Sequence, residues 1–111
     1  MDLHRLAEKR SIAYHRVIAE RMRCEPAVLA RARARVRSWL SVTAGGPSYA
    51  HRWQEVLSRD VEAIAAFLVE DSELACELRQ STPFAGVLSP TERWQIWRAV
   101  GATESTGRDA R

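Results

Sequence analysis

Apolar residues recur through the first part of the chain at the spacing of one face of an α-helix. They are Leu3, Ala7, Tyr14, Ile18 and Met22, with Leu6 and Val17 beside them. Steps of four and seven residues are typical of an amphipathic helix whose apolar stripe covers a core. Asp2 has the side chain of a helix N-cap, and Glu25 precedes a proline, which disfavours helical geometry. The pattern predicts a helix from residue 2 to about residue 23.

A second helix is predicted from Pro26, which suits the first position of a helix, to about Val42. Its apolar line consists of Leu29, Ala32, Val36, Trp39 and Leu40. The connection to the first helix is short, so we expect residues 1–42 to form an antiparallel helical hairpin.

Four arginines alternate along this second helix. They are Arg31, Arg33, Arg35 and Arg37. On a helix this spacing separates them into two pairs, 31/35 and 33/37, which flank the apolar stripe from both sides. A helix that follows nucleic-acid phosphates would more naturally gather its basic residues on one side.

Residues 43–47, which read TAGGP, form the clearest break in the chain. Gly45 or Gly46 can adopt the left-handed backbone that ends a helix, and the proline after them prevents continuation. Helical patterns restart at Ser48, at Asp60 and at the acidic cluster of residues 70–73. We expect three short helices here, the first of them capped by Ser48.

The connection formed by residues 83–88 is apolar, and an apolar connection is expected to be buried because surface loops are usually polar. A final helix is then predicted from Ser89 to about Val100. Ser89 and Glu92 have the spacing of a capping box, and Pro90 occupies the first helical position. We expect this segment to act as a structural clamp between the last two helices.

Two tryptophans, Trp94 and Trp97, lie one turn apart on this last helix. They supply more apolar surface than so short a helix needs for its own attachment. We expect them to pack in the core. The alternative is an anchor for a partner, because tryptophan and arginine concentrate binding energy at interfaces.

These patterns predict an all-α fold, with a single domain of five to six helices in residues 1–100. A long N-terminal helical hairpin, residues 1–42, is expected to pack on a compact helical cluster formed by residues 48–100. Residues 101–111 are small and polar and are expected to form a flexible tail.

Charge differs between the two parts of the chain. Residues 1–40 hold ten basic residues against four acidic ones, and residues 41–111 hold seven against ten. The basic part could face nucleic acid, an acidic partner or the acidic part of the same molecule. A hydrophobic content of 46% and a charged content of 28% are those of an ordinary globular protein.

No apolar run is long enough to span a bilayer, so no membrane association is expected. The N-terminus lacks the pattern of a signal peptide, and we expect a cytoplasmic protein. Cys24 and Cys76 have neither a metal-site spacing nor a disulfide framework, and we expect both to be buried thiols.

The sequence contains no recognisable catalytic motif, so no enzyme activity, cofactor or metal site is expected. His4, His15 and His51 fall on different parts of the predicted helices. His4 and His15 lie three turns apart without the spacing of a zinc site, and we expect solvated or interfacial positions for them.

Four stretches resemble a group of short bacterial helical proteins that are encoded beside nucleotidyltransferase toxins of the abortive-infection type. The stretches are residues 78–88 (LRQSTPFAGVL), 92–94 (ERW), 13–21 (AYHRVIAER) and 30–36 (ARARARV). The likeness covers most of residues 3–100. It implies an antitoxin that sequesters the neighbouring toxin by protein–protein contact.

The function expected from the sequence is therefore non-catalytic binding of a toxin partner. The expected contact residues are Arg31, Arg33, Arg35 and Arg37 as rim charges, with Trp39, Trp94 and Trp97 as possible anchors. One alternative is a small nucleic-acid-binding regulator that uses the arginine-rich hairpin, and another is a homodimeric adaptor.

Overall fold

The computed structural model describes the backbone of residues 2–42 and 46–109, and side chains up to Thr103. The described chain forms six α-helices and no strand, which confirms the all-α prediction. They are α1 (Leu3–Cys24), α2 (Pro26–Val42), α3 (Ser48–Leu57), α4 (Val61–Leu68), α5 (Glu73–Arg79) and α6 (Pro90–Asp109). In this part of the chain, none of the helices has the length and apolar character needed to cross a membrane.

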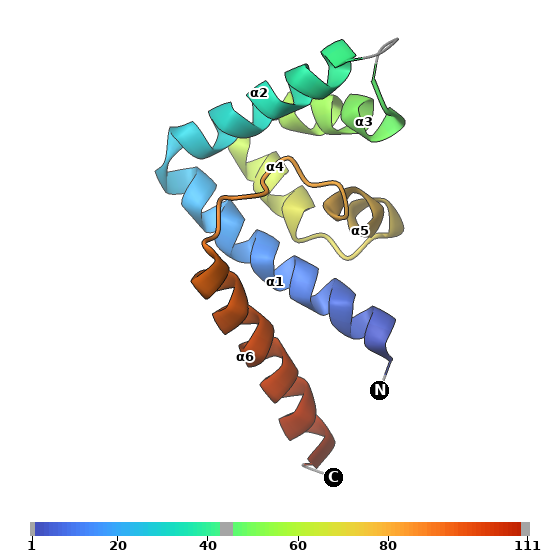
Figure 1. Ribbon diagram of the computed structural model, residues 1–111, viewed down its shortest axis with the longest axis vertical. Helices are drawn as coiled ribbons and strands as arrows, with labels where there is room; N and C mark the ends of the chain where they lie inside the picture. Colours follow the sequence, from blue (N-terminus) through green and yellow to red (C-terminus); the bar gives the residue numbers. More distant parts are fainter. Residues whose placement is uncertain (1, 43–45, 110–111) are drawn as a thin grey trace.

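The first two helices form an open V that organises the rest of the chain (Figure 1). The helices α1 and α2 diverge from the connection at Glu25, and α4 and α5 lie between their arms. The helix α3 lies along α2, whereas α6 lies along α1 and runs back towards the N-terminus. The N-terminal hairpin is thus open, and α6 packs at the margin of the molecule.

The core is built around the fully buried Trp53 of α3. Its ring meets Phe67 of α4 and Phe84 of the last connection edge to face, with ring centroids 5.9 Å and 6.3 Å away. The Trp53 indole Nε1–H donates to the carbonyl oxygen of Leu78 at 3.2 Å, so the polar atom of this buried ring has a partner. As predicted, the apolar connection is buried at Phe84 and Leu88, which are 1% and 5% exposed.

Local capping explains why most helices begin where the sequence predicts. Asp2 accepts hydrogen bonds from two backbone N–H groups of α1, and Asp60 accepts one from Ala63 in α4. At α6 the predicted capping box is present: Ser89 Oγ accepts from the Glu92 N–H at 3.1 Å, and Glu92 Oε1 accepts from the Ser89 N–H at 2.9 Å. The predicted cap at Ser48 is wrong, because Pro47 occupies the cap position of α3 without a side-chain hydrogen bond.

The turn between α2 and α3 needs a glycine at Gly46. Its φ is +77°, and a Cβ there would lie 2.5 Å from the carbonyl oxygen of Trp39. Gly45, the other residue predicted for this conformation, lies outside the described residues. After the turn, Tyr49 meets the Trp39 ring edge to face at 5.2 Å, which joins α3 to α2.

The last helix is longer than predicted. It continues through Gly101 to Asp109, so the expected end near Val100 is wrong. A glycine inside a helix costs only about 1 kcal/mol relative to alanine, and no proline follows to stop the helix. A Cβ atom on Gly101 would lie only 2.7 Å from Nη2 of Arg10, so this position packs closely against α1.

The two cysteines differ from the expectation of burial. Cys24 is exposed at the last residue of α1, and Cys76 is half-buried in α5. Cys24 follows Arg23 on the side of the helix that carries the charged residues, which explains its exposure. The Cys76 Sγ accepts a hydrogen bond from Arg79 Nη2 at 3.2 Å. Both cysteines are free thiols.

Candidate functional site

Two of the four arginines predicted as contact residues on α2 bind backbone carbonyl groups of the same chain. Arg33 donates from Nε and Nη2 to the carbonyl oxygen of Leu57, at 3.0 Å and 2.8 Å, and so caps the end of α3. Arg35 Nη1 donates to the carbonyl oxygen of Ala85 at 2.8 Å and holds the last connection. All four residues are exposed to solvent. Arg33 and Arg35 stabilise the fold through these hydrogen bonds, whereas Arg31 and Arg37 form no hydrogen bond or ion pair with another described residue.

The predicted division of these arginines into two pairs is confirmed. Arg31 and Arg35 line a hollow of about 490 Å³ beside the last connection, and Arg33 and Arg37 line a separate one of about 220 Å³ beside α3. The helix α2 consequently has no single face that gathers all four cations.

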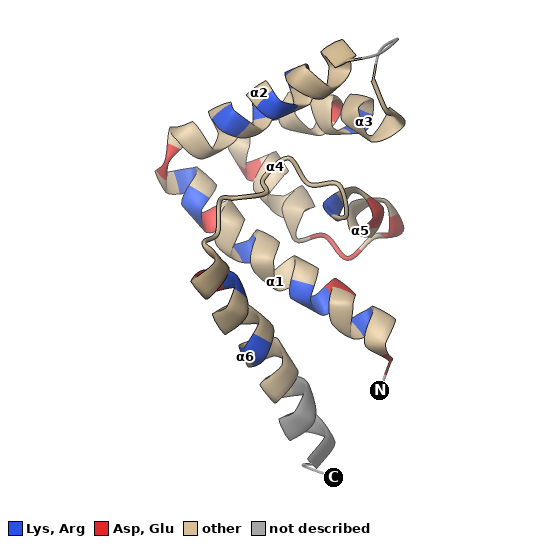
Figure 2. Ribbon diagram, in the orientation of Figure 1, with Lys and Arg blue, Asp and Glu red and all other residues tan. Residues whose placement is uncertain are grey.

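Basic residues lie along α1 (Figure 2), and ion pairs link three of them to the acidic part of the chain. They join Arg5 to Asp71 at 3.0 Å, Arg23 to Glu62 at 3.0 Å, and Arg21 to Glu92. The charge asymmetry suggested nucleic acid, an acidic partner or the acidic part of the same molecule as the surface facing the basic residues. The ion pairs show that α1 contacts the last of these. Exposed pairs of this kind contribute little stability individually.

The tryptophans of α6 are exposed, so the expectation of core packing is wrong. Trp94 and Trp97 are 54% and 40% exposed, and their rings stack with centroids 5.0 Å apart and an interplanar angle of 12°. In the described part of the chain α6 packs against no helix but α1. It turns Ile96 towards the core, which leaves the tryptophan side uncovered. Trp39, the third predicted anchor, is half-buried against Tyr49.

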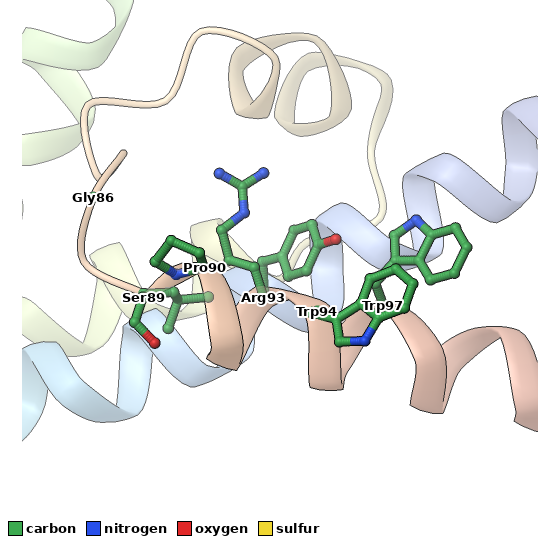
Figure 3. A pocket seen from close by; sticks show the side chains of 8 residues that line it. Gly86, Ser89, Pro90, Arg93, Trp94 and Trp97 are labelled. Carbon is green, nitrogen blue, oxygen red and sulfur yellow. The ribbon is translucent and has the colours of Figure 1, made fainter.

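A hollow of about 580 Å³ lies beside these tryptophans (Figure 3). We call it the aromatic groove; its principal lining residues are Tyr14, Leu88, Pro90, Arg93, Trp94 and Trp97. Figure 3 shows Trp94 and Trp97 next to each other on one side of α6, with Arg93 one turn from Trp97. The Arg93 guanidinium lies over the Tyr14 ring at 5.2 Å from its centroid. The groove thus combines aromatic faces from α1 and α6 with a cation.

Arg10 of α1 extends this surface. Its guanidinium lies 3.7 Å from the centroid of the Trp97 ring, and its Nε donates to the Trp97 carbonyl oxygen at 3.1 Å. A cation over an indole face is a favourable contact, strongest where water is excluded. These two contacts hold Trp97 in place while its neighbour Trp94 stays open to solvent.

The start of α6, which positions the groove, is fixed by Arg21. This side chain pairs with Glu92 and also donates from Nη1 to the carbonyl oxygen of Val87 at 3.0 Å. The hydrogen bond from Arg21, together with the Ser89 N–H, lowers the pKa of Glu92 to about 2. The carboxylate therefore stays ionised over the physiological range and holds α6 to α1.

Beneath the groove a second hollow of about 260 Å³ contains His15. A solvated or interfacial position was expected for this side chain, but it is buried inside the molecule and only 3% exposed. A carbonyl oxygen can only accept, so Nδ1–H donates to Ser11 O at 2.8 Å, and Nε2 accepts from the Thr82 hydroxyl at 2.9 Å. Burial, with the nearby positive charge of Arg79, lowers the pKa of His15 to about 4. The imidazole is neutral and joins α1 to the last connection.

Arg79 is the second buried polar residue, at 3% exposed. Its Nη1 donates to the carbonyl oxygens of Leu68 and Glu70 at 3.2 Å and 2.8 Å, which satisfies the end of α4. Its Nε has no hydrogen-bond partner among the described atoms. The Leu68 carbonyl lies at the negative end of the α4 dipole, which offsets part of the cost of burying the charge.

One group of possible metal ligands is present among the described residues. Ligand atoms of Glu8, Asp71 and Cys76 lie within 4.8 Å of one another. Arg5 already donates to Glu8 at 3.2 Å and to Asp71 at 3.0 Å, so a cation occupies the position between the carboxylates. This cluster therefore does not provide a metal site.

The three histidines differ in their surroundings within the described chain. His4 lies near Glu8 at 3.2 Å, His15 is buried with Thr82, and His51 is exposed on α3. No pair of them shares a partner that could form a nucleophile–base arrangement. We therefore assign no catalytic group to any of them.

Arg10, Tyr14 and Arg93 were not predicted as parts of the site. One signal was available: Arg10 and Tyr14 lie four residues apart on α1, and Arg93 and Trp97 are related in the same way on α6. Such pairs suggest cation–aromatic contacts along a helix. Instead, each cation here reaches an aromatic ring on the other helix.

No protein-family model matches this chain, and searches of the curated proteins and of the solved structures return no significant match. The resemblance to antitoxin-like helical proteins accordingly stays a prediction.

Proposed function

We propose that this chain is a non-catalytic, antitoxin-like cytoplasmic protein that neutralises a nucleotidyltransferase toxin by binding to it directly. The observation that carries the proposal is the exposed, stacked pair Trp94 and Trp97 beside the aromatic groove. The identity of the partner is taken from the sequence resemblance alone.

Exposed tryptophans support the binding part of this proposal. A large aromatic side chain buries about 150–250 Å² when it is covered, and Trp94 and Trp97 leave 54% and 40% of their surface open. Where a tryptophan is an energetic centre of an interface, its removal costs at least about 2 kcal/mol. The stacking of the two rings also restricts them before binding, which lowers the entropy lost on association.

The hairpin has a narrower role in this proposal than the sequence suggested. Arg33 and Arg35 bind carbonyl groups within the fold, so Arg31 and Arg37 remain as rim charges on α2. Rim charges affect association rate more than affinity. The principal contact is therefore assigned to α6 and the facing side of α1.

Co-expression with the product of the adjacent gene, which the proposal expects to be a nucleotidyltransferase toxin, tests the proposal. The tagged chain is expected to retain the toxin during purification and to relieve its growth inhibition. The double variant Trp94→Ala/Trp97→Ala should lose both effects. Leu74→Ala, which truncates an apolar residue of α5 that is 40% exposed, is the matched control and should retain them. Failure to form a complex at micromolar concentration would rule the proposal out.

A nucleic-acid-binding regulator is the second candidate, and one observation favours it. The exposed Trp94 ring is a stacking platform of the kind that single-stranded nucleic acid uses, and Arg31 and Arg37 are exposed on α2. This candidate predicts a mobility shift that weakens steeply as salt is raised. A shift that is absent, or unaffected by salt, removes it.

A further inference from the structure

The aromatic groove carries positive charge with no negative charge among its lining residues. Of the described residues, no aspartate or glutamate lines this groove or the hollow beneath it. Arg93 lines both hollows, and Arg79 lines the lower one. Since a cation near apolar surface attracts an anion more strongly than one in open water does, the groove favours a negatively charged ligand.

The two arginines at these aromatic rings, Arg10 of α1 and Arg93 of α6, differ from three other arginines of α1. Arg5, Arg21 and Arg23 each pair with a carboxylate. In contrast, Arg10 and Arg93 contact aromatic rings and have no carboxylate partner among the described residues. Arg10 lies over the ring of Trp97, which stacks on the exposed Trp94, and Arg93 lies over the ring of Tyr14. This surface therefore has two cations that remain available for anionic groups.

The walls of the groove indicate that a negatively charged ligand would also carry an apolar group. Leu88, Pro90 and the rings of Tyr14 and Trp94 form an apolar lining next to Arg93. Grooves lined by aromatic residues bind extended peptides through apolar side chains that lie against the rings. A volume of about 580 Å³ accommodates one or two such side chains in an open hollow.

We propose that the aromatic groove binds an acidic, extended peptide segment of the partner protein, with one apolar side chain inserted between Tyr14 and Trp94. Carboxylates on either side of that anchor pair with Arg10 and Arg93. This inference rests on the proposed function, which it extends by giving the chemistry of the segment that the partner presents.

Charge also argues against the two other occupants of this surface. A second copy of the chain related by a two-fold axis would bring Arg10 and Arg93 against a surface of the same sign. A nucleic-acid strand would need cations along its path, whereas Arg93 is the only basic residue among the described residues that line the groove. An acidic peptide meets both the apolar lining and the two cations.

Fluorescence anisotropy with labelled peptides tests the inference. Short probes share a central leucine–proline pair and carry glutamate, glutamine or lysine on both sides. Against the full chain, the glutamate probe is expected to bind saturably and about tenfold more tightly than the glutamine probe, and the lysine probe most weakly. Equal binding of all three, or no binding of the glutamate probe up to millimolar concentration, would overturn the inference.

Variants locate the binding on the surface. Trp94→Ala should weaken the glutamate probe at least about tenfold. Arg93→Gln and Arg10→Gln should remove its advantage over the glutamine probe. Arg52→Gln makes the same change of charge at an exposed position of α3 and should leave that advantage intact. Circular dichroism melting confirms that each variant is folded. If Arg52→Gln loses the preference for the glutamate probe as much as Arg93→Gln and Arg10→Gln do, the assignment of the peptide site to the groove is refuted.

Two further measurements separate the other occupants. If a labelled single-stranded oligonucleotide binds more tightly than the glutamate probe and depends on Trp94 and Arg93, the groove is a nucleic-acid site and the inference fails. If light scattering shows a dimer that Trp94→Ala dissociates, the second copy is the occupant and the inference also fails.

Failure of this inference can be told apart from failure of the proposed function. If the toxin co-purifies with the Arg93→Gln and Trp94→Ala variants as with the wild type, the groove is wrongly assigned and the antitoxin function stands. If the glutamate probe binds in the predicted way but no toxin is retained, the peptide site stands and the antitoxin function falls.

Discussion

At the scale of single residues, buried side chains of the last connection decide how firmly α6 is held. Phe84 is 1% exposed, its ring meets Trp53, and its N–H donates to the Thr82 hydroxyl at 3.2 Å. The same hydroxyl donates to His15, so one short network joins the core, the connection and α1. Hydrogen-bonded networks of this kind are costly to break because the groups left behind are buried.

Phe84→Ala is expected to lower the free energy of unfolding by about 3–5 kcal/mol, as truncation of a buried phenylalanine does. Chemical denaturation measures the change. Leu74→Ala removes an apolar side chain that is already 40% exposed and serves as the control, with a much smaller expected loss. If Phe84→Ala is as stable as the wild type, the connection is not packed as described.

His15 makes stability depend on pH. Its pKa is about 4 in the folded chain against an ordinary value of 6.5, so between these values the unfolded chain binds a proton that the folded chain does not. The free energy of unfolding should therefore fall as the pH is lowered from 6.5 towards 4, by up to about 3 kcal/mol.

Denaturation at a series of pH values between 6.5 and 5 measures how the free energy of unfolding changes with pH. This range is chosen because it lies above the pH at which carboxyl groups become protonated. His15→Gln should remove most of the slope, whereas His51→Gln, at an exposed position of α3, should leave it unchanged. An unaltered slope in His15→Gln would mean that another group causes it.

At the scale of elements, local signals determine where helices begin. The sequence predicts both Ser48 and Ser89 as helix caps. Ser89 immediately precedes α6, whereas Ser48 is the first residue of α3. Only Ser89 accepts the capping hydrogen bond, because Ser48 is already the first residue inside α3. Ser89→Ala is expected to cost about 1 kcal/mol of stability. Ser48→Ala should cost far less, and thermal melts that show equal losses would contradict this assignment.

The helical pattern of the sequence predicted every helix and most of the starting residues, because spacing, prolines and caps act within a few residues of chain. The end of α6 was missed because the small, polar residues after Val100 were interpreted as a tail, whereas the helix continues past Gly101, where the Arg10 side chain packs against it. The roles of Arg33 and Arg35 were missed because their acceptors, the carbonyls of Leu57 and Ala85, are brought to them by the fold.

At the scale of the whole molecule, the exposure of the tryptophans follows from how few elements cover α6. Residues 94 and 97 fit a core stripe as well as a binding surface, and sequence spacing alone does not distinguish the two. The arrangement of α1, α4 and α6 shows that these residues are not in the core, because α6 lies outside the V formed by the first two helices (Figure 1). The candidate site was therefore half predicted: its tryptophans were named, but the groove and its cations Arg10 and Arg93 were not.

The central claim is that a partner protein binds the surface formed by Trp94 and Trp97. Isothermal titration calorimetry of the proposed toxin partner into the wild-type chain and into the Trp94→Ala/Trp97→Ala variant tests it most directly. We predict micromolar or tighter binding with a negative heat-capacity change for the wild type, because apolar surface is buried. For the variant we predict at least about tenfold weaker binding. Equal affinity of a folded variant and the wild type would contradict the claim.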